Sequence, residues 1–104
     1  IYFSFERQEG KEPLLVECSR NGIKVKIIRT GEIMEFADTS NSYVSIVNSF
    51  SDWIRNRSSA GGEYIVFTVK PSASGYINTL KGKITELKYQ SGMEPVEEEM
   101  ETVF

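Results

Sequence analysis

The 104-residue sequence predicts a two-layer α+β fold in which two helices pack on one face of a small mixed β-sheet. Three patterns indicate this fold: an alternating apolar and basic hairpin near the N-terminus, two segments with helical spacing of apolar residues, and a β-branched and aromatic run between those segments. The expected order of elements is β-β-(β)-α-β-α-β, where the bracketed strand is short.

An antiparallel hairpin is the element that the local sequence specifies best. Residues 14–18 form a short apolar run, and Asn21-Gly22 follows with two residues that accept the positive φ of a tight turn. Apolar and basic side chains then alternate through residues 23–28, as expected for a strand with one buried face. After a break, residues 32–36 are expected to form the third strand.

The middle of the chain predicts a helix followed by a buried strand. Apolar and aromatic side chains recur at spacings of three and four through residues 43–57, which places them on one helical face. Capping residues at 38–42 precede this segment, and the serine- and glycine-rich run 58–62 ends it. Residues 64–69 are β-branched or aromatic on both faces and predict a central strand covered on each side.

A second helix is expected within residues 76–88, because its apolar side chains also fall on one face. Ser72 or Ser74 is expected to cap this helix. The last strand is expected within residues 89–96.

The domain is assigned to residues 13–96, with an N-terminal extension at 1–12 and a solvated acidic tail at 97–104. Five of the fifteen acidic residues lie in the last eleven positions, and without them ten acids face twelve bases. A body so close to neutral gives no general electrostatic case for nucleic-acid binding. Because the chain begins at Ile1 and has no bilayer-length apolar run, membrane contact is expected only through a segment absent from it.

The residue types present argue against an enzyme, a cofactor or a metal site. The sequence has no histidine and one cysteine, which removes the commonest general base and most zinc and nucleophile arrangements. Cys18 follows an apolar alternation and is expected in the core rather than as a nucleophile. Tyr43, Trp53 and Tyr76 lie on the helical stripes and are expected in the core or at its rim.

One candidate site is the turn that joins the buried strand to the second helix. A lysine, two hydroxyls and exposed backbone amides there can hold a phosphate or a carboxylate. The residues of this possible anion-binding site are Lys70, Ser72, Ser74 and Gly75. A strand ended by proline and followed by a serine cap explains the same residues.

A second candidate is a basic surface on and around the hairpin, formed by Arg20, Lys24, Lys26 and Arg29. Such a surface can meet an acidic polymer, but bases on the outer face of a strand also protect against edge-to-edge aggregation. Aromatic residues interleaved with these bases, as in single-strand binders, are not evident. No nucleic-acid partner is therefore expected.

With these elements placed, the layout resembles the soluble domain of the ExbD/TolR biopolymer-transport family. That family has a strand ending in a polar-Asn/Asp-Gly turn, a return strand, a helix, a buried strand, a second helix and a last strand. The matching stretches are residues 14–28, 43–57, 64–70, 76–88 and 89–96. Residues 15–22 and 64–71 also resemble recurrent segments in bacterial proteins of this general shape.

The resemblance implies a domain beyond the inner membrane that follows one transmembrane helix and is often dimeric. Its role would be mechanical, coupling a proton-driven motor to an envelope partner or to peptidoglycan. The ionisable aspartate of the family lies in a transmembrane part that this chain lacks, so no site residue is carried over. The resemblance favours a periplasmic or envelope location, whereas the residues alone leave the cytoplasm open.

The expected function is therefore that of a non-enzymatic interaction or scaffolding domain. If the resemblance holds, this domain would be the soluble part of a membrane-anchored envelope transport-type protein. It would bind a protein partner or a second copy of itself through a symmetric interface or a sheet edge, supplied by the hairpin or the last strand. The alternative is a small anion-binding or ligand-sensing module centred on the turn at residues 70–75.

Overall fold

The computed structural model describes residues 10–37, 43–57 and 62–103. The capping cluster at 38–42 and most of the helix stop at 58–62 lie outside the described residues. The elements in chain order are β1 (Glu12–Ser19), β2 (Gly22–Ile27), β3 (Glu32–Ala37), α1 (Tyr43–Arg57), β4 (Glu63–Val69), the short 3-10 turn η1 (Pro71–Ala73), α2 (Ile77–Glu86) and β5 (Gln90–Pro95).

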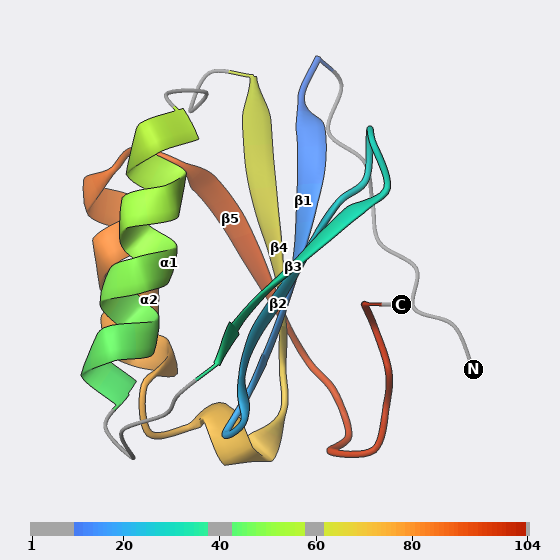
Figure 1. The fold of residues 1–104 in the computed structure, drawn as a ribbon, viewed down its shortest axis with the longest axis vertical. Helices are drawn as coiled ribbons and strands as arrows, with labels where there is room; N and C mark the ends of the chain where they lie inside the picture. Colours follow the sequence, from blue (N-terminus) through green and yellow to red (C-terminus); the bar gives the residue numbers. More distant parts are fainter. Residues whose placement is uncertain (1–9, 38–42, 58–61, 104) are drawn as a thin grey trace.

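The strands form one mixed sheet in the order β3-β2-β1-β4-β5. The β1, β2 and β3 strands pair antiparallel, while β4 runs parallel to both β1 and β5. Because the chain steps from β1 to β4 and then to β5 in one direction, right-handed crossovers place α1 and α2 on the same face. Figure 1 shows both helices on that face, which confirms the predicted α+β class and its two layers.

The core lies between the sheet and the two helices. Alternate residues of the two central strands point into it, with Val16 of β1 opposite Phe67 of β4, and both are fully buried. The ring of Phe50 on α1 lies 6.5 Å from that of Phe67 and 5.7 Å edge-on from that of Phe36 on β3. Burying each such side chain contributes about 1.5–3 kcal/mol, so these contacts fix the helix layer on the sheet.

An ion pair ties the end of α1 to the start of β4. Arg57 donates to both carboxylate oxygens of Glu63, with Nε 2.9 Å from Oε1, and its guanidinium lies 4.8 Å from the Trp53 ring centroid. The hydroxyl of Tyr89, just before β5, donates to the same carboxylate at 3.3 Å. The buried carboxylate of Glu63 thus joins α1, β4 and the residue before β5 at this end of the sheet.

The predicted serine cap on the second helix is wrong. The helix α2 begins at Ile77, and its N-cap residue, Tyr76, makes no side-chain capping bond. The chain first closes η1, where the N–H of Ser74 donates to the carbonyl of Pro71 at 3.2 Å. Ser72 and Ser74 therefore lie in the preceding turn, before the first amides of α2.

The hydroxyl of Tyr76 anchors the start of α2 to the hairpin instead. It donates to the carbonyl oxygens of Ser19 at 2.7 Å and Gly22 at 3.3 Å. Burial raises the pKa of Tyr76, so the phenol remains a neutral donor at ordinary pH.

The interpretation of the acidic end as a solvated tail is wrong for its last residues. After β5 the chain turns back and runs along the sheet on the side opposite the helices (Figure 1). Thr102 and Val103 there are only 3% and 5% exposed, although the glutamates before them are exposed. We call residues 97–103 the C-terminal strap. The glutamates predicted a solvated segment, but Thr102 and Val103, which follow them, are buried.

The last strand lies at an edge of the sheet as expected, but the other free edge differs from the expectation. The hairpin formed by β1 and β2 was expected to supply an edge, but β3 pairs along β2 and encloses it. Among the described residues the outer strands are β3 and β5. No helix in the described part of the chain has the length and apolar character needed to span a membrane.

Gly22 is the residue of the hairpin turn whose substitution we expect to be most costly. Its φ is +138°, and an added Cβ would overlap the backbone carbonyl oxygen of Phe36 on β3. We expect Gly22→Ala to lower the free energy of unfolding by about 2 kcal/mol or more, measured by urea titration. Gly31 has a φ of +78° but open space around it, so Gly31→Ala should cost about 1 kcal/mol. Equal losses in the two variants would contradict the role of the Phe36 contact.

Candidate functional site

The turn after β4 was predicted to hold an anion, and Ser72 does bind a carboxylate that belongs to the same chain. The backbone N–H of Ser72 donates to Oε1 of Glu98 at 3.0 Å, and its hydroxyl donates to Oε2 at 2.7 Å. The Ser72 oxygen also accepts the backbone N–H of Arg20 at 3.0 Å. The serine side chain therefore links the strap, the turn and the tip of the hairpin.

Lys70 faces a different carboxylate. Its Nζ lies 3.5 Å from Oε1 of Glu17 on β1, and only 12% of the lysine side chain is exposed. Ser74 uses its N–H within η1, and Gly75 lies against the ring of Tyr43. The four predicted residues therefore do not converge on one point.

Glu17 is a buried acid with a full set of donors. Its Oε2 accepts the N–H of Thr102 at 2.9 Å, the Thr102 hydroxyl at 2.8 Å and the N–H of Val103 at 3.3 Å. Thr68 pairs with Glu17 in the parallel register of β1 and β4, and its hydroxyl lies 2.6 Å from that of Thr102. Because the Thr102 hydroxyl donates to the carboxylate, Thr68 donates to Thr102.

These contacts decide the charge state of Glu17. Burial raises the pKa of its carboxyl, but the hydrogen bonds from Thr102, the ammonium of Lys70 and the N–H of Val103 outweigh burial and hold the pKa below its usual value. The hydroxyl and N–H of Ser72 likewise lower the pKa of Glu98. Two carboxylates thus fasten the strap reciprocally: Glu17 on the sheet binds its end, and Glu98 near its start binds the turn.

The predicted basic surface is not one patch. Lys24 lies on β2 with its Nζ 3.8 Å from Oε1 of Glu35 on β3, and Lys26 is half-buried further along β2. Arg20 and Arg29 flank β2 at its opposite ends. A six-residue strand spans roughly 20 Å, so these four bases do not act on a single contact point.

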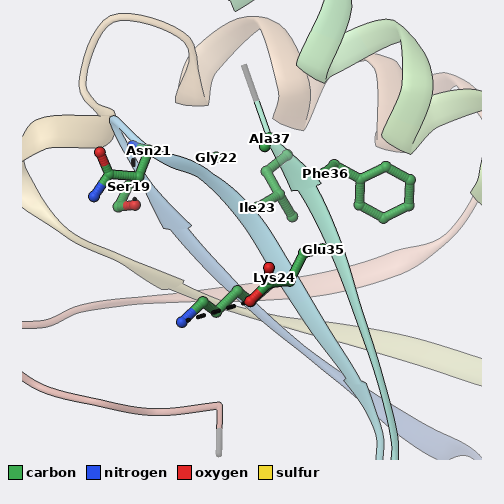
Figure 2. A pocket seen from close by; sticks show the side chains of 8 residues that line it. All are labelled: Ser19, Asn21, Gly22, Ile23, Lys24, Glu35, Phe36 and Ala37. Atoms are coloured by element: carbon green, nitrogen blue, oxygen red, sulfur yellow. Dashed lines mark hydrogen bonds and ion pairs between the residues drawn. The ribbon is translucent and has the colours of Figure 1, made fainter. Parts of the chain in front are cut away.

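A pocket of about 210 Å³ lies where the hairpin tip meets the end of β3. Figure 2 shows Lys24 and Glu35 directed toward each other across the two strands that line this pocket. Phe36 lines the same pocket, and its ring packs against α1 residues Phe50 and Trp53. The charged groups at this pocket therefore already neutralise each other.

The prediction that Cys18 lies in the core is confirmed. The residue is fully buried, and burial raises the pKa of its thiol to about 12. Almost no thiolate is present at neutral pH, so this cysteine is not an activated nucleophile. Among the residues that the structure describes, no three cysteine or acidic side chains are grouped closely enough to bind a metal ion.

Sequence reasoning missed the contact between Glu17 and Thr102. The available signal was a single acid within the otherwise apolar run of residues 14–18, which a buried strand tolerates only when donors reach it. Nothing in the sequence indicated that residue 102 supplies these donors. Comparison of the chain with protein-family models, with curated proteins and with solved structures gave no match.

The lowered pKa of Glu17 predicts a pH-dependent stability. Since its folded pKa lies below the ordinary value of about 4.5, its contribution is present above that pH and is lost as pH falls through the folded pKa. We expect Glu17→Gln to lose about 1–3 kcal/mol of unfolding free energy at pH 7 and to show a flatter decline toward pH 3.

Urea titrations at a series of pH values between 3 and 7 measure both effects. Glu86→Gln, at an exposed position on α2, is the matched control and should reproduce the wild-type pH profile. A Glu17→Gln profile parallel to that of the wild type would show that this carboxylate does not carry the pH dependence.

Proposed function

We propose that this chain is a non-enzymatic interaction domain that associates through the free edge of β3. The observation that supports the proposal most is the character of this edge. Among the described residues β3 pairs only with β2, and Ile33, its second residue, is 47% exposed. An open strand edge with an apolar side chain is a template for pairing with another strand.

The other free edge is better protected. The β5 strand contains Gly92, the exposed Glu94 and Pro95, which has no N–H to donate. Exposed glutamates of the strap follow directly after it. Glycine, charge and proline all oppose pairing in sheets, so β3 is the better candidate for an interaction edge.

A second copy of the chain is the occupant that fits β3 best. Antiparallel pairing centred on Ile33 would place the two Ile33 side chains opposite each other and Glu32 opposite Met34, with Glu35 beside Gly31 in the turn before β3. No two carboxylates face each other directly in this register. The resulting interface is symmetric and would continue the sheet across both copies.

Several groups that catalysis or anion binding could use are already engaged by contacts within the chain. Cys18 is buried with a raised pKa, and Glu17 is surrounded by donors. The alternative of an anion-binding module is supported less well, because Lys70 faces Glu17 and the donors of Ser72 hold Glu98. These contacts favour an interaction role over catalysis or anion sensing.

Sedimentation velocity over a range of protein concentrations tests the association. We expect the wild-type sedimentation coefficient to rise with concentration between roughly 10 μM and 1 mM, and Ile33→Lys to remain monomeric, because two lysines would face each other in the pairing register. Val44→Lys is the matched control, since Val44 is the other large exposed hydrophobic residue of the described chain but lies on α1. A wild-type protein that stays monomeric at 1 mM would contradict self-association.

The resemblance to the ExbD/TolR family extends the proposal to an envelope location, with the domain serving as the soluble part of a membrane-anchored protein. The extension predicts a hydrophobic helix ahead of Ile1 in the full reading frame. After cell fractionation, the full-length protein should sediment with membranes and require detergent for release. Material that is soluble without detergent would overturn the envelope extension but leave the β3 association to its own test.

A further inference from the structure

A second surface feature lies on the helix layer, away from the free edge of β3. An open pocket of about 280 Å³ lies between the first two turns of α1 and the facing side of α2. Its lining includes Tyr43, Val44 and Val47 from the first helix, and Tyr76, Thr79 and Lys83 from the second helix and its start. This volume is just below the range typical of drug-sized ligands and suits a fragment of roughly ten heavy atoms.

The wall of the pocket is apolar and aromatic. The rings of Tyr43 and Tyr76 lie with their centroids 5.0 Å apart and their planes at 43°. Val47 is buried, whereas Val44 is 65% exposed, the largest exposure among the big hydrophobic residues that the structure describes. An apolar body placed against these side chains would cover Val44 and gain burial energy at about 25 cal/mol per Å².

The space in the pocket depends on Gly75. A Cβ added at this position would lie 3.1 Å from Cε2 of the Tyr43 ring, closer than ordinary packing allows. The glycine therefore gives the Tyr43 ring room at this edge of the pocket. Its replacement by alanine would push the ring and change the shape of the pocket, with no positive φ at that residue to add strain.

The pocket also carries a positive charge, which belongs to Lys83. Lys83 is half-buried, and among the described residues it makes no ion pair and no side-chain hydrogen bond. Lys83 lies in the last turn of α2, one helical turn after Thr79, which also lines the pocket. A cation beside an apolar wall matches a ligand with an apolar body and one negative group.

We propose that this pocket binds a small carboxylate with an apolar or aromatic body, held by its carboxylate at Lys83 and by its body against Tyr43, Val44 and Val47. The proposal rests on the chemistry of the helix layer and is independent of association through β3. A fragment of this size in an open pocket is expected to bind with a dissociation constant in the millimolar range.

Sodium phenylacetate is the probe, titrated to about 20 mM into ¹⁵N-labelled protein at constant ionic strength. We expect saturable amide shifts confined to Val44, Val47, Gly75 and Thr79. Lys83→Gln should weaken binding at least fivefold, whereas Lys81→Gln, at an exposed position on the same helix, should bind like the wild type. The neutral analogue 2-phenylethanol should bind at least fivefold more weakly than phenylacetate.

Gly75→Ala provides a second variant, and we expect it to weaken phenylacetate binding while the rest of the amide spectrum stays unchanged. Shifts that are absent or scattered over the surface at 20 mM would overturn the proposal. Binding that is unchanged in Lys83→Gln, or equal for phenylacetate and 2-phenylethanol, would overturn the assignment of a carboxylate ligand.

Discussion

The structure depends on the need to bury β1 on both faces and along both edges. This strand pairs with β2 on one side and β4 on the other, and the helices cover one of its faces. Its other face carries Glu17, and a charge in that position is tolerated only with hydrogen-bond donors around it. The donors come from Thr102 and Val103, and Lys70 adds an ion pair, so the position of the strap follows from the presence of one acid in the central strand.

The sequence allowed most of the fold to be predicted, because its signals are local. The Asn21-Gly22 turn, the helical spacing of residues 43–57 and the apolar run 64–69 each report on their own neighbourhood, and the corresponding elements are present. The position of the strap could not be read in this way. Glu17 and Thr102 are separated by 85 residues, and neither residue type specifies the other.

The candidate sites illustrate the same limit in chemical detail. The turn at residues 70–75 had the composition of an anion site, and composition could not show that Glu98 would reach Ser72 or that Lys70 would face β1. The predicted basic residues lie on or beside β2. The sequence did not indicate that Lys24 pairs with Glu35, or that the length of β2 separates Arg20 from Arg29. The pocket at Lys83 arises only when the two helices are packed together.

The link between Glu17 and Thr102 has a consequence for the order of events during synthesis. The donors for Glu17 are encoded 85 residues after it, so the central strand is synthesised well before its buried charge can be satisfied. Long-range contacts slow folding, and this one cannot form until the strap has left the ribosome. A nascent chain interrupted before residue 102 would retain an acid with an incomplete set of donors. Full stability of the central strand therefore requires the strap as well as the sheet and the helices.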